Sequence, residues 1–416
     1  MTASTLETLY PFSQVSSQRL RYSALRRTHS QLFLELPKSA GMFFSAPGRT
    51  ELCGNHTDHN LGAVVCAAVD MDIAAFATPR KDRRVRIESA GFPFLDLDVE
   101  DLAVHPVETG LSASIVRGIA KGIETLGRGK PMGFDAVMNS RIPSGSGLSS
   151  SAAYEVLIGK IFSTFSQTEI SPFELAKVGQ YAENVYFGKP SGLMDQMACA
   201  IGSALLIDFS RSQDPLLDPL DFDLGNHGHS LFIVGTGGSH EDLTPDYAAI
   251  PREMRAVAAL FGKSELAGLR QGDLLARLPE IRLALGDRAF LRAWHFVKET
   301  QRSHALAQAL REKDISRFLA TVKDSGLSSL ACLQNLSSPG NPREQGLLLG
   351  LALSQDCLSG KGAARVHGGG FAGTIQAFVP KEMSQGFTAC MGSAFGADSV
   401  FSLHLRHHGV VCIERI

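Results

Sequence analysis

The sequence predicts an α+β fold that is divided into two domains. Its 416 residues exceed what one ordinary hydrophobic core organises, so two domains of about 200 residues each are expected. Strand-like and helix-like segments also mix without the strict alternation of a doubly wound parallel sheet. A loop at residues 211–229, which contains Pro215 and Pro219, separates a mixed first part from a second part rich in helices. We therefore expect one domain over residues 1–215 and another over 216–416, with the last strands able to return to the first.

Hydrophobic patterning predicts the elements of the first domain. Residues 1 to about 38 are expected to form polar helices, because leucines such as Leu20 and Leu25 stand among charged and polar positions. A long apolar segment rich in β-branched residues covers 63–77. Strands are expected at 43–46, 85–88, 94–99, 134–138 and 204–209, and helices at 112–126, 149–165 and 174–187.

The second domain is expected to be mostly helical around a few strands. A strand at 231–234 opens it, and a strand-loop-strand unit covers 363–379. Helices are expected at about 252–261, 287–310, 314–324, 343–355 and 382–396, and the final strands at 399–405 and 409–414. The sequence shows no internal repeat and no low-complexity tract.

Composition and charge suit either a small-molecule enzyme or a protein-binding module. The 40 basic and 42 acidic residues give a net charge of −2, so nothing favours binding to nucleic acid or to a membrane surface. The seven cysteines are scattered without a CxxC pair, which argues against disulfides and structural zinc and for a reducing compartment. No apolar stretch reaches the ~18 residues of a membrane span, and no signal-peptide pattern is visible, so we expect a cytoplasmic protein.

A glycine- and serine-rich segment follows the expected strand at 134–138 and opens the expected helix at 149–165. It consists of Ser144, Gly145, Ser146, Gly147, Leu148, Ser149, Ser150 and Ser151. Small residues at a helix N-terminus let backbone N–H groups approach a phosphate, with support from the helix dipole. The segment lacks the lysine of a Walker P-loop. Taken alone, it is either a phosphate-binding loop or a flexible turn with serine caps.

A second glycine-rich segment covers Arg365–Gly373 and contains the pattern G-x-G-x-x-G. The residues that follow, 374–379, read TIQAFV and predict a strand, whereas the dinucleotide-binding fingerprint requires a helix at that point. A glycine loop between two strands is better explained as a hairpin. From these residues alone, it is either a structural turn or a loop that approaches a ligand closely.

A third segment, Ala46–Asn60, places polar and ionisable side chains between apolar runs. Such a segment is either a surface loop or a site that hydrogen-bonds a hydroxyl-rich ligand. His56 and His59 could be considered as metal ligands, but no matching Cys or His pair stands out elsewhere. A metal site at these histidines is therefore disfavoured.

Together with Lys189–Gln196, these segments resemble the motifs of the GHMP kinases, and of the galactokinase family in particular. Gly48–His59 is similar to the signature G-R-x-N-L-I-G-E-H-x-D-Y, the serine-rich loop to P-x-G-x-G-L-S-S-S-A, and the hairpin to T-G-G-G-F-G-G. The resemblance extends from about residue 40 to 380. It implies a two-domain GHMP kinase fold with the active site in the cleft between the domains. It also implies transfer of phosphate from ATP, with Mg²⁺, to the anomeric hydroxyl of a small-molecule sugar.

The resemblance also implies a role for individual residues. Asp195 is expected to be the catalytic base, and Arg49 to lie beside it and stabilise negative charge. Ser151 and Glu183 are the implied Mg²⁺ ligands. The implied sugar contacts are Glu51, Asn55, His56, Asp58, Gly192 and Tyr247. The implied ATP-binding residues are Ser144, Gly145, Ser146, Gly147, Leu148, Ser149, Ser150, Ser151, Gly369 and Gly370. As partners we expect only sugar and ATP, with a monomer or weak homodimer as the assembly.

The chain departs from the family pattern at a few positions. Glu51 stands where the signature has Asn, Asn55 where it has Glu, and His59 where it has Tyr. His367 precedes the glycines where the family often has Thr. The exchange between positions 51 and 55 leaves other sugars open, such as a galacturonate or an N-acetylhexosamine. A non-catalytic sensor of sugar and ATP is the alternative from another class, although the Ser-Ser-Ala segment at 150–152 is intact.

Overall fold

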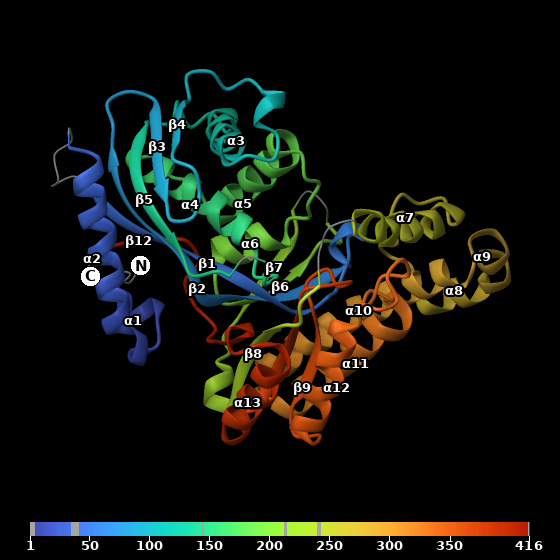
Figure 1. Ribbon diagram of the computed structural model, residues 1–416. Helices are drawn as coiled ribbons and strands as arrows, with labels where there is room; N and C mark the ends of the chain where they lie inside the picture. Colours follow the sequence, from blue (N-terminus) through green and yellow to red (C-terminus); the bar gives the residue numbers. More distant parts are fainter. Residues whose placement is uncertain (1–4, 35–40, 144, 212–213, 239–242, 415) are drawn as a thin grey trace.

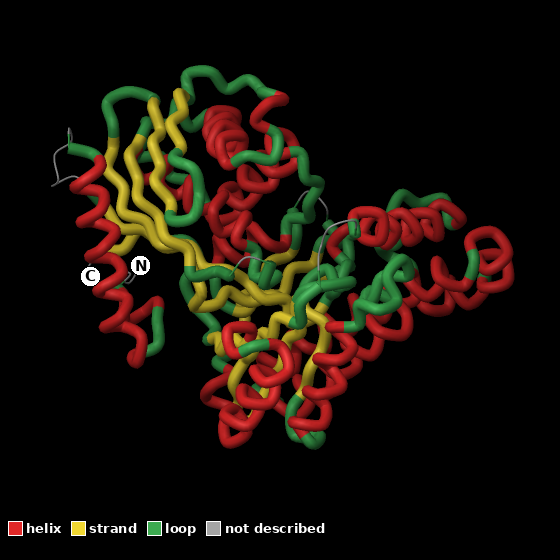
Figure 2. The backbone as a smooth tube through the Cα atoms, viewed as in Figure 1, coloured by secondary structure: helices red, strands yellow, loops and turns green. Residues whose placement is uncertain are grey.

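The protein folds around two β-sheets that are covered by helices (Figures 1 and 2). The computed structural model describes residues 5–34, 41–143, 145–211, 214–238, 243–414 and 416. Most strands pair antiparallel with neighbours that are not next in sequence, and helices are interspersed among them. This arrangement confirms the predicted α+β fold class.

The larger sheet has the strand order β12-β1-β2-β5-β3-β4, and β6 pairs with β2 while β7 pairs with β6. Its strands are β1 (Met42–Cys53), β2 (Ala63–Pro79), β3 (Arg84–Ser89), β4 (Leu95–Asp98), β5 (Phe134–Ser140), β6 (Ala204–Asp208), β7 (Leu216–Leu220) and β12 (Val411–Ile413). Only β3 and β5 run parallel among these pairs. β2 lies in the middle of the sheet, which explains why its sequence is a nearly continuous apolar run.

Helices cover both faces of this sheet. One face carries α3 (Ser112–Thr125), α4 (Ser150–Phe165), α5 (Pro172–Tyr181) and α6 (Met194–Ile201), whose apolar sides fill the main core. The opposite face carries α1 (Leu6–Leu9) and α2 (Phe12–Leu32), which appear in dark blue in Figure 1. Tyr22 of α2 is fully buried there, with its ring centroid 5.7 Å from that of Phe43 on β1. The N-terminal helices therefore brace the back of the sheet.

The smaller sheet has the order β11-β8-β10-β9, with β8 (His229–Gly235), β9 (Ala363–His367), β10 (Thr374–Pro380) and β11 (Val400–Leu403). Alternation along β8 decides its packing. Phe232 and Val234 pack under α12 (Gly346–Leu358) and α13 (Ser384–Phe395), whereas Leu231 and Ile233 belong to the main core. One continuous core thus joins the two sheets.

The remaining helices form an extension at the right of Figure 1 and the layer that connects it to the sheets. They are α7 (Thr244–Leu260), α8 (Gln271–Ala276), α9 (Leu278–Leu285), α10 (Asp287–Arg311) and α11 (Ile315–Ser328). The extension has its own small core, which includes Ile250, Met254 and Ile281. The long helix α10 contacts both α7 and β2, so it ties the extension to the larger sheet. Within the described ranges, no helix is long and apolar enough to span a membrane.

Three local expectations need revision. The loop expected at 211–229 contains β7, which among the described strands pairs only with β6 and so tolerates Pro219 at a sheet edge. The strand expected at 43–46 continues as β1 to Cys53, with register shifts between Pro47 and Arg49 and between Glu51 and Cys53. The short helices α8 and α9 were not expected. The division at residues 215 and 216 stays a prediction, although the last strand, β12, pairs with β1.

Candidate active site

Asp195 and Arg49 form an ion pair where α6 meets β1. Arg49 Nε donates to Asp195 Oδ1 at 2.7 Å, and Ser149 Oγ donates to Asp195 Oδ2 at 2.5 Å. Burial alone would raise the pKa of Asp195, but Arg49 and Ser149 outweigh it and hold that pKa below its usual value. Asp195 is therefore an ionised carboxylate at neutral pH. Its side chain keeps 31% exposure, so the carboxylate remains accessible to a substrate.

The serine-rich loop lies at the N-terminus of α4, as expected. Ser149 is the N-cap residue and adopts the left-handed conformation with φ 58°. The Leu148 carbonyl accepts from the Arg49 backbone N–H at 3.0 Å, and a Cβ atom on Gly48 would lie 2.7 Å from that same oxygen. β1 and the loop can therefore approach this closely because residue 48 is glycine. Ser144 lies outside the described residues.

A cavity of about 270 Å³ opens between this loop and the hairpin that joins β9 to β10. Its lining consists of Arg49, Pro143, Gly145–Ser151, Lys189, Asp195, Gly368 and Gly369. The structure thus brings together the predicted catalytic pair, the described part of the phosphate loop and Gly369. Sequence reasoning placed Gly368 at the site as well, but it assigned no role there to Pro143 or Lys189. Lys189 had a signal, because it opens the same Lys-Pro-Ser-Gly segment that leads to Asp195.

Glu183 lies in a π-helical turn, η4 (Ala182–Phe187), that follows α5. Its Oε1 accepts from Lys189 Nζ at 2.8 Å and from Ser151 Oγ at 3.3 Å, and its Oε2 accepts from Ser191 Oγ at 2.6 Å and Gln196 Nε2 at 2.9 Å. Burial would lower the pKa of Lys189, but Glu183 reverses this effect and raises it. A cation and a carboxylate therefore face each other at the edge of the cavity.

Ser151 and Glu183 suit Mg²⁺ in their chemistry. Both present oxygen, the donor that Mg²⁺ prefers, and adjacent ligands in an octahedron with 2.1 Å bonds lie about 3 Å apart. The Ser151 Oγ to Glu183 Oε1 distance of 3.3 Å is close to that value. Among the residues that the structure describes, no group of three or more His, Cys, Asp or Glu could hold a metal by itself. Two protein oxygens leave most coordination positions for nucleotide phosphates and water.

Asp58 and Gly192, two of the predicted sugar contacts, lie against each other. Asp58 begins the 3-10 turn η2 (Asp58–Asn60), and its Oδ1 accepts from the His59 backbone N–H at 2.9 Å. A Cβ atom at Gly192 would lie only 2.0 Å from Asp58 Oδ2. Glycine is therefore required for Asp58 to approach the segment that carries Asp195. Neither Asp58 nor Gly192 lines the cavity beside the phosphate loop.

Tyr247, on α7, contacts the glycine hairpin. Its hydroxyl donates to the Gly370 carbonyl at 2.8 Å, and its ring lies edge-on to Phe371 with 5.3 Å between the ring centroids. A Cβ atom at Gly369 would approach Tyr247 Cε1 to 2.6 Å. Tyr247 thus joins the helical extension to the hairpin that lines the cavity.

Glu51, Asn55 and His56 do not line the cavity. Glu51 and Asn55 are only 4% and 1% exposed. His56 Nε2 lies 2.9 Å from the Gly369 carbonyl, so it carries the proton and donates. Burial, reinforced by neighbouring His59, lowers the pKa of His56 to about 4, which keeps the ring neutral. The structure places these three residues behind the glycine hairpin, and their predicted role as sugar contacts remains a prediction.

His367 connects all three motif segments. Its Nε2 lies 3.1 Å from Thr50 Oγ1 on β1, and its Nδ1 lies 3.1 Å from Thr374 Oγ1 on β10. Thr374 Oγ1 in turn donates to the Ser146 carbonyl of the phosphate loop at 3.1 Å. Burial, with Arg49 next in effect, lowers the pKa of His367 to about 3. A neutral histidine therefore bridges motif one, motif three and the phosphate loop.

Comparison with known proteins agrees with this geometry. The profile of the GHMP kinases N terminal domain matches residues 114–203, and that of the galactokinase galactose-binding signature matches residues 28–79. The structure superposes on the crystal structure of Lactococcus lactis galactokinase complexed with galactose with a TM-score of 0.80, at 23% identity over 94% of this chain and 99% of that one. It also resembles Methanococcus jannaschii mevalonate kinase with a TM-score of 0.62. The fold and site thus define a small-molecule kinase of the GHMP type.

Sequence relatives narrow the assignment. The galactokinase of Actinobacillus pleuropneumoniae serotype 3 is 32% identical over 83% of this chain and 86% of its own length. The galactokinase of Streptomyces coelicolor is 32% identical over 85% of this chain and 88% of its own, and that of Lactobacillus helveticus 30% over 88% and 93%. The chain belongs to the galactokinase family, and it is therefore a sugar kinase.

Proposed function

We propose that this protein transfers the γ-phosphoryl group of ATP to the anomeric hydroxyl of galactose. The observation that carries the proposal is the position of Asp195. Its ionised carboxylate is held between Arg49 and Ser149, and it lines the same cavity as the N-terminal loop of α4. A fixed base beside a phosphate-binding loop is what in-line phosphoryl transfer to a hydroxyl needs.

Asp195 acts as the general base in this reaction. It accepts the proton of the anomeric hydroxyl while that oxygen forms a bond to the γ-phosphorus and the bond from phosphorus to the ADP oxygen breaks. Arg49 keeps Asp195 ionised and places a positive charge beside the transferring group, because its Nε and Nη1 are held by Asp195 and the Gly147 carbonyl. The first effect keeps the base in its proton-accepting form, and the second stabilises the transition state.

The nucleotide phosphates bind along the loop at Gly145–Ser151, where the backbone N–H groups at the start of α4 are available. Lys189, which also lines the cavity, supplies a further positive charge. Held by Ser151 and Glu183, Mg²⁺ would neutralise charge on the phosphate oxygens. Gly369 and Gly370 close the site from the hairpin.

Asp58, Gly192 and Tyr247 are our candidates for orienting the sugar. The carboxylate of Asp58, whose side chain is 12% exposed, can accept hydrogen bonds from sugar hydroxyls, and its close approach to Gly192 keeps it beside the segment of Asp195. A second candidate keeps the same chemistry and acts on another sugar, such as a galacturonate or an N-acetylhexosamine; it requires the exchanged residues 51 and 55 to contact the sugar.

The experiment that tests the proposal is ADP release with Mg-ATP across galactose, glucose, galactosamine, N-acetylgalactosamine, galacturonate and mannose. Asp195→Asn should lower kcat by about 100-fold or more while sugar binding stays measurable, because the base is lost and the shape is kept. Asp356→Asn, at an exposed position, is the matched control. If another sugar in the panel is preferred, that sugar replaces galactose as the proposed substrate. If the protein binds ATP but releases no ADP with any of these sugars, the non-catalytic sensor is favoured.

Two further expectations are part of the proposal. Cys53, Cys66, Cys199, Cys332, Cys357, Cys390 and Cys412 are all free thiols, which suits the reducing cytoplasm. We also propose a monomer or weak homodimer, which sedimentation at several concentrations would test.

A further inference from the structure

The exchanged residues of the first motif meet inside the protein. Asn55 Nδ2 lies 3.3 Å from Glu51 Oε1, although four positions separate them in sequence. Both side chains are buried, and neither lines the cavity. The carboxylate and the amide that have changed places relative to the family signature are therefore direct neighbours.

Glu51 is the partner of a fully buried arginine. Arg365 Nη2 donates to Glu51 Oε1 at 2.8 Å, and its Nη1 donates to the Leu52 carbonyl at 2.9 Å. The Arg365 side chain has 0% exposure, so its charge needs a carboxylate nearby. The other close carboxylate, Glu299, is already engaged by Arg302 at 2.6 Å and by the Gly54 backbone N–H at 3.0 Å.

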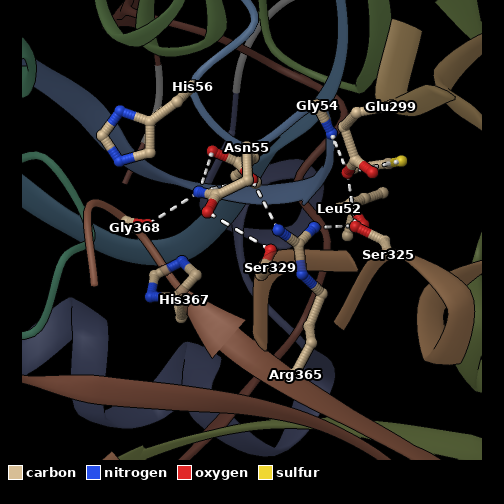
Figure 3. Close-up of polar contacts among 12 residues, drawn as sticks. Leu52, Gly54, Asn55, His56, Glu299, Ser325, Ser329, Arg365, His367 and Gly368 are labelled. Carbon is tan, nitrogen blue, oxygen red and sulfur yellow. Dashed lines mark hydrogen bonds and ion pairs between the residues drawn. The ribbon is translucent and has the colours of Figure 1, made fainter. Parts of the chain in front are cut away.

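Asn55 makes contacts that need both ends of an amide. Its Nδ2 donates to the Gly368 carbonyl at 2.8 Å (Figure 3), and its Oδ1 accepts from Asn335 Nδ2 at 2.8 Å. A carboxylate at position 55 cannot donate to a carbonyl oxygen. The contact holds Gly368, and Gly368 lines the cavity together with Gly369.

We propose that Glu51, Asn55 and Arg365 form a positioning unit that fixes the glycine hairpin to the first motif, and that the exchange at positions 51 and 55 is reciprocal. One residue of the pair must supply the carboxylate for Arg365, and the other an amide. Each residue is a positioning residue, because it acts through Gly368 rather than on a substrate. This inference rests on the proposed function and adds that the exchange leaves sugar choice unchanged.

Three variants test the reciprocity: E51N, N55E and the double exchange E51N/N55E. E51N leaves Arg365 without its carboxylate, and N55E places a second carboxylate 3.3 Å from the first and against the Gly368 carbonyl. Each single change should lower the folding equilibrium constant by about 100-fold or more. The double exchange keeps one carboxylate and one amide. Its folding equilibrium constant should therefore be at least tenfold higher than the two single effects combined would give. Glu382→Asn, at an exposed position, is the control.

Denaturant unfolding measures this cycle without any assumption about the reaction. If the losses of unfolding free energy in E51N and N55E simply add in the double variant, the exchange is not reciprocal. A fourth variant, N55D, keeps the shape of the side chain and removes its donor. If the amide positions the hairpin, N55D should raise the KM for ATP about tenfold and leave the order of sugars in the panel unchanged.

A changed order of sugars in N55D or in the double exchange would overturn the positioning role, because residue 55 would then contact the sugar. An unchanged KM for ATP in N55D would also overturn it. If instead the unaltered protein turned over no sugar, the proposed function would fail. The unfolding cycle would still decide the reciprocity.

Discussion

Replacing His367 with Thr, the residue that the family often has there, should destabilise this protein and weaken its binding of ATP. The hydrogen bonds around the His367 ring determine which of its two nitrogens carries the proton. Because Thr374 donates to Ser146, it must accept from His367 Nδ1–H. The Nε2 atom is then a bare acceptor, to which the Thr50 hydroxyl donates, while Gln376 donates to Thr50 Oγ1 at 2.5 Å.

The magnitude follows from the contacts that are lost. A threonine at 367 is too short to reach both hydroxyls, so at least one buried group, on Thr50 or Thr374, loses its partner. Such a group costs about 1–3 kcal/mol, and the volume of the missing ring adds to it. We therefore expect the free energy of unfolding to fall by about 2–4 kcal/mol. The KM for ATP should rise as well, because Thr374 holds the Ser146 carbonyl of the phosphate loop.

Urea unfolding at a series of pH values is the assay. The pKa of His367 is lowered to about 3, so the unfolded chain binds a proton that the folded protein does not between pH 6.5 and 3. The stabilising effect of the neutral ring is therefore complete above pH 6.5 and is lost as the pH falls toward 3. The slope of stability against pH should be smaller in His367→Thr by up to about 1.4 kcal/mol per pH unit.

His407→Thr, at an exposed position, serves as the control. An identical slope in His367→Thr and the unaltered protein between pH 4 and 6 would show that the ring is not held neutral. A loss of stability below about 0.5 kcal/mol at pH 7 would show that the bridge does not contribute.

Three further predictions follow from other contacts. Arg21→Met should lower the free energy of unfolding, measured in urea, by about 3 kcal/mol, because Arg21 Nη1 pairs with buried Asp72 at 2.6 Å. Arg27→Met, on the same helix, should change this free energy little, and both variants should leave the KM values unchanged. Gly192→Ala should raise the sugar KM about 10- to 100-fold and spare that of ATP, since its Cβ would collide with Asp58 Oδ2; an unchanged sugar KM would remove Asp58 from the sugar site. The acid limb of kcat/KM should lie below pH 3.8, because Asp195 has a lowered pKa and acts as a base only above it; a limb near pH 6 would assign the base elsewhere.

Elements with strong local patterns were predictable from the sequence. The apolar spacing around Ile115 and Ile119 and the following Gly127 predicted the helix that α3 forms. The glycine loop between two strand-like runs predicted the β9–β10 hairpin, whose strands pair antiparallel. The short helices α8 and α9 gave no comparable signal, because six to eight residues are too few for helical periodicity to stand out.

The partners of buried charges were not predictable. Nothing local indicates that Glu51 pairs with Arg365, which is 314 positions away, or that Asp72 accepts from Arg21 and from Tyr10 Oη. Such pairs depend on how β1 packs against β9 and on how the N-terminal helices cover the sheet. Sequence alone therefore placed Glu51 and Asn55 in the first motif, but it could not show that their side chains contact Arg365 and Gly368.

The backbone conformation of the site likewise depends on contacts between segments that are distant in sequence. His56, Ser149 and Phe371, one in each motif segment, adopt the left-handed conformation although none is glycine. Each costs about 1–3 kcal/mol, so the local sequence would not choose it. Each is held from another segment: His56 by the Gly369 carbonyl, Ser149 by Asp195, and Phe371 by the edge-on ring of Tyr247. The hairpin is also tied to the phosphate loop, because Thr374 donates to the Ser146 carbonyl, so a change at the hairpin should reach that loop. The departures at positions 51, 55 and 367 are accordingly expected to act together rather than singly.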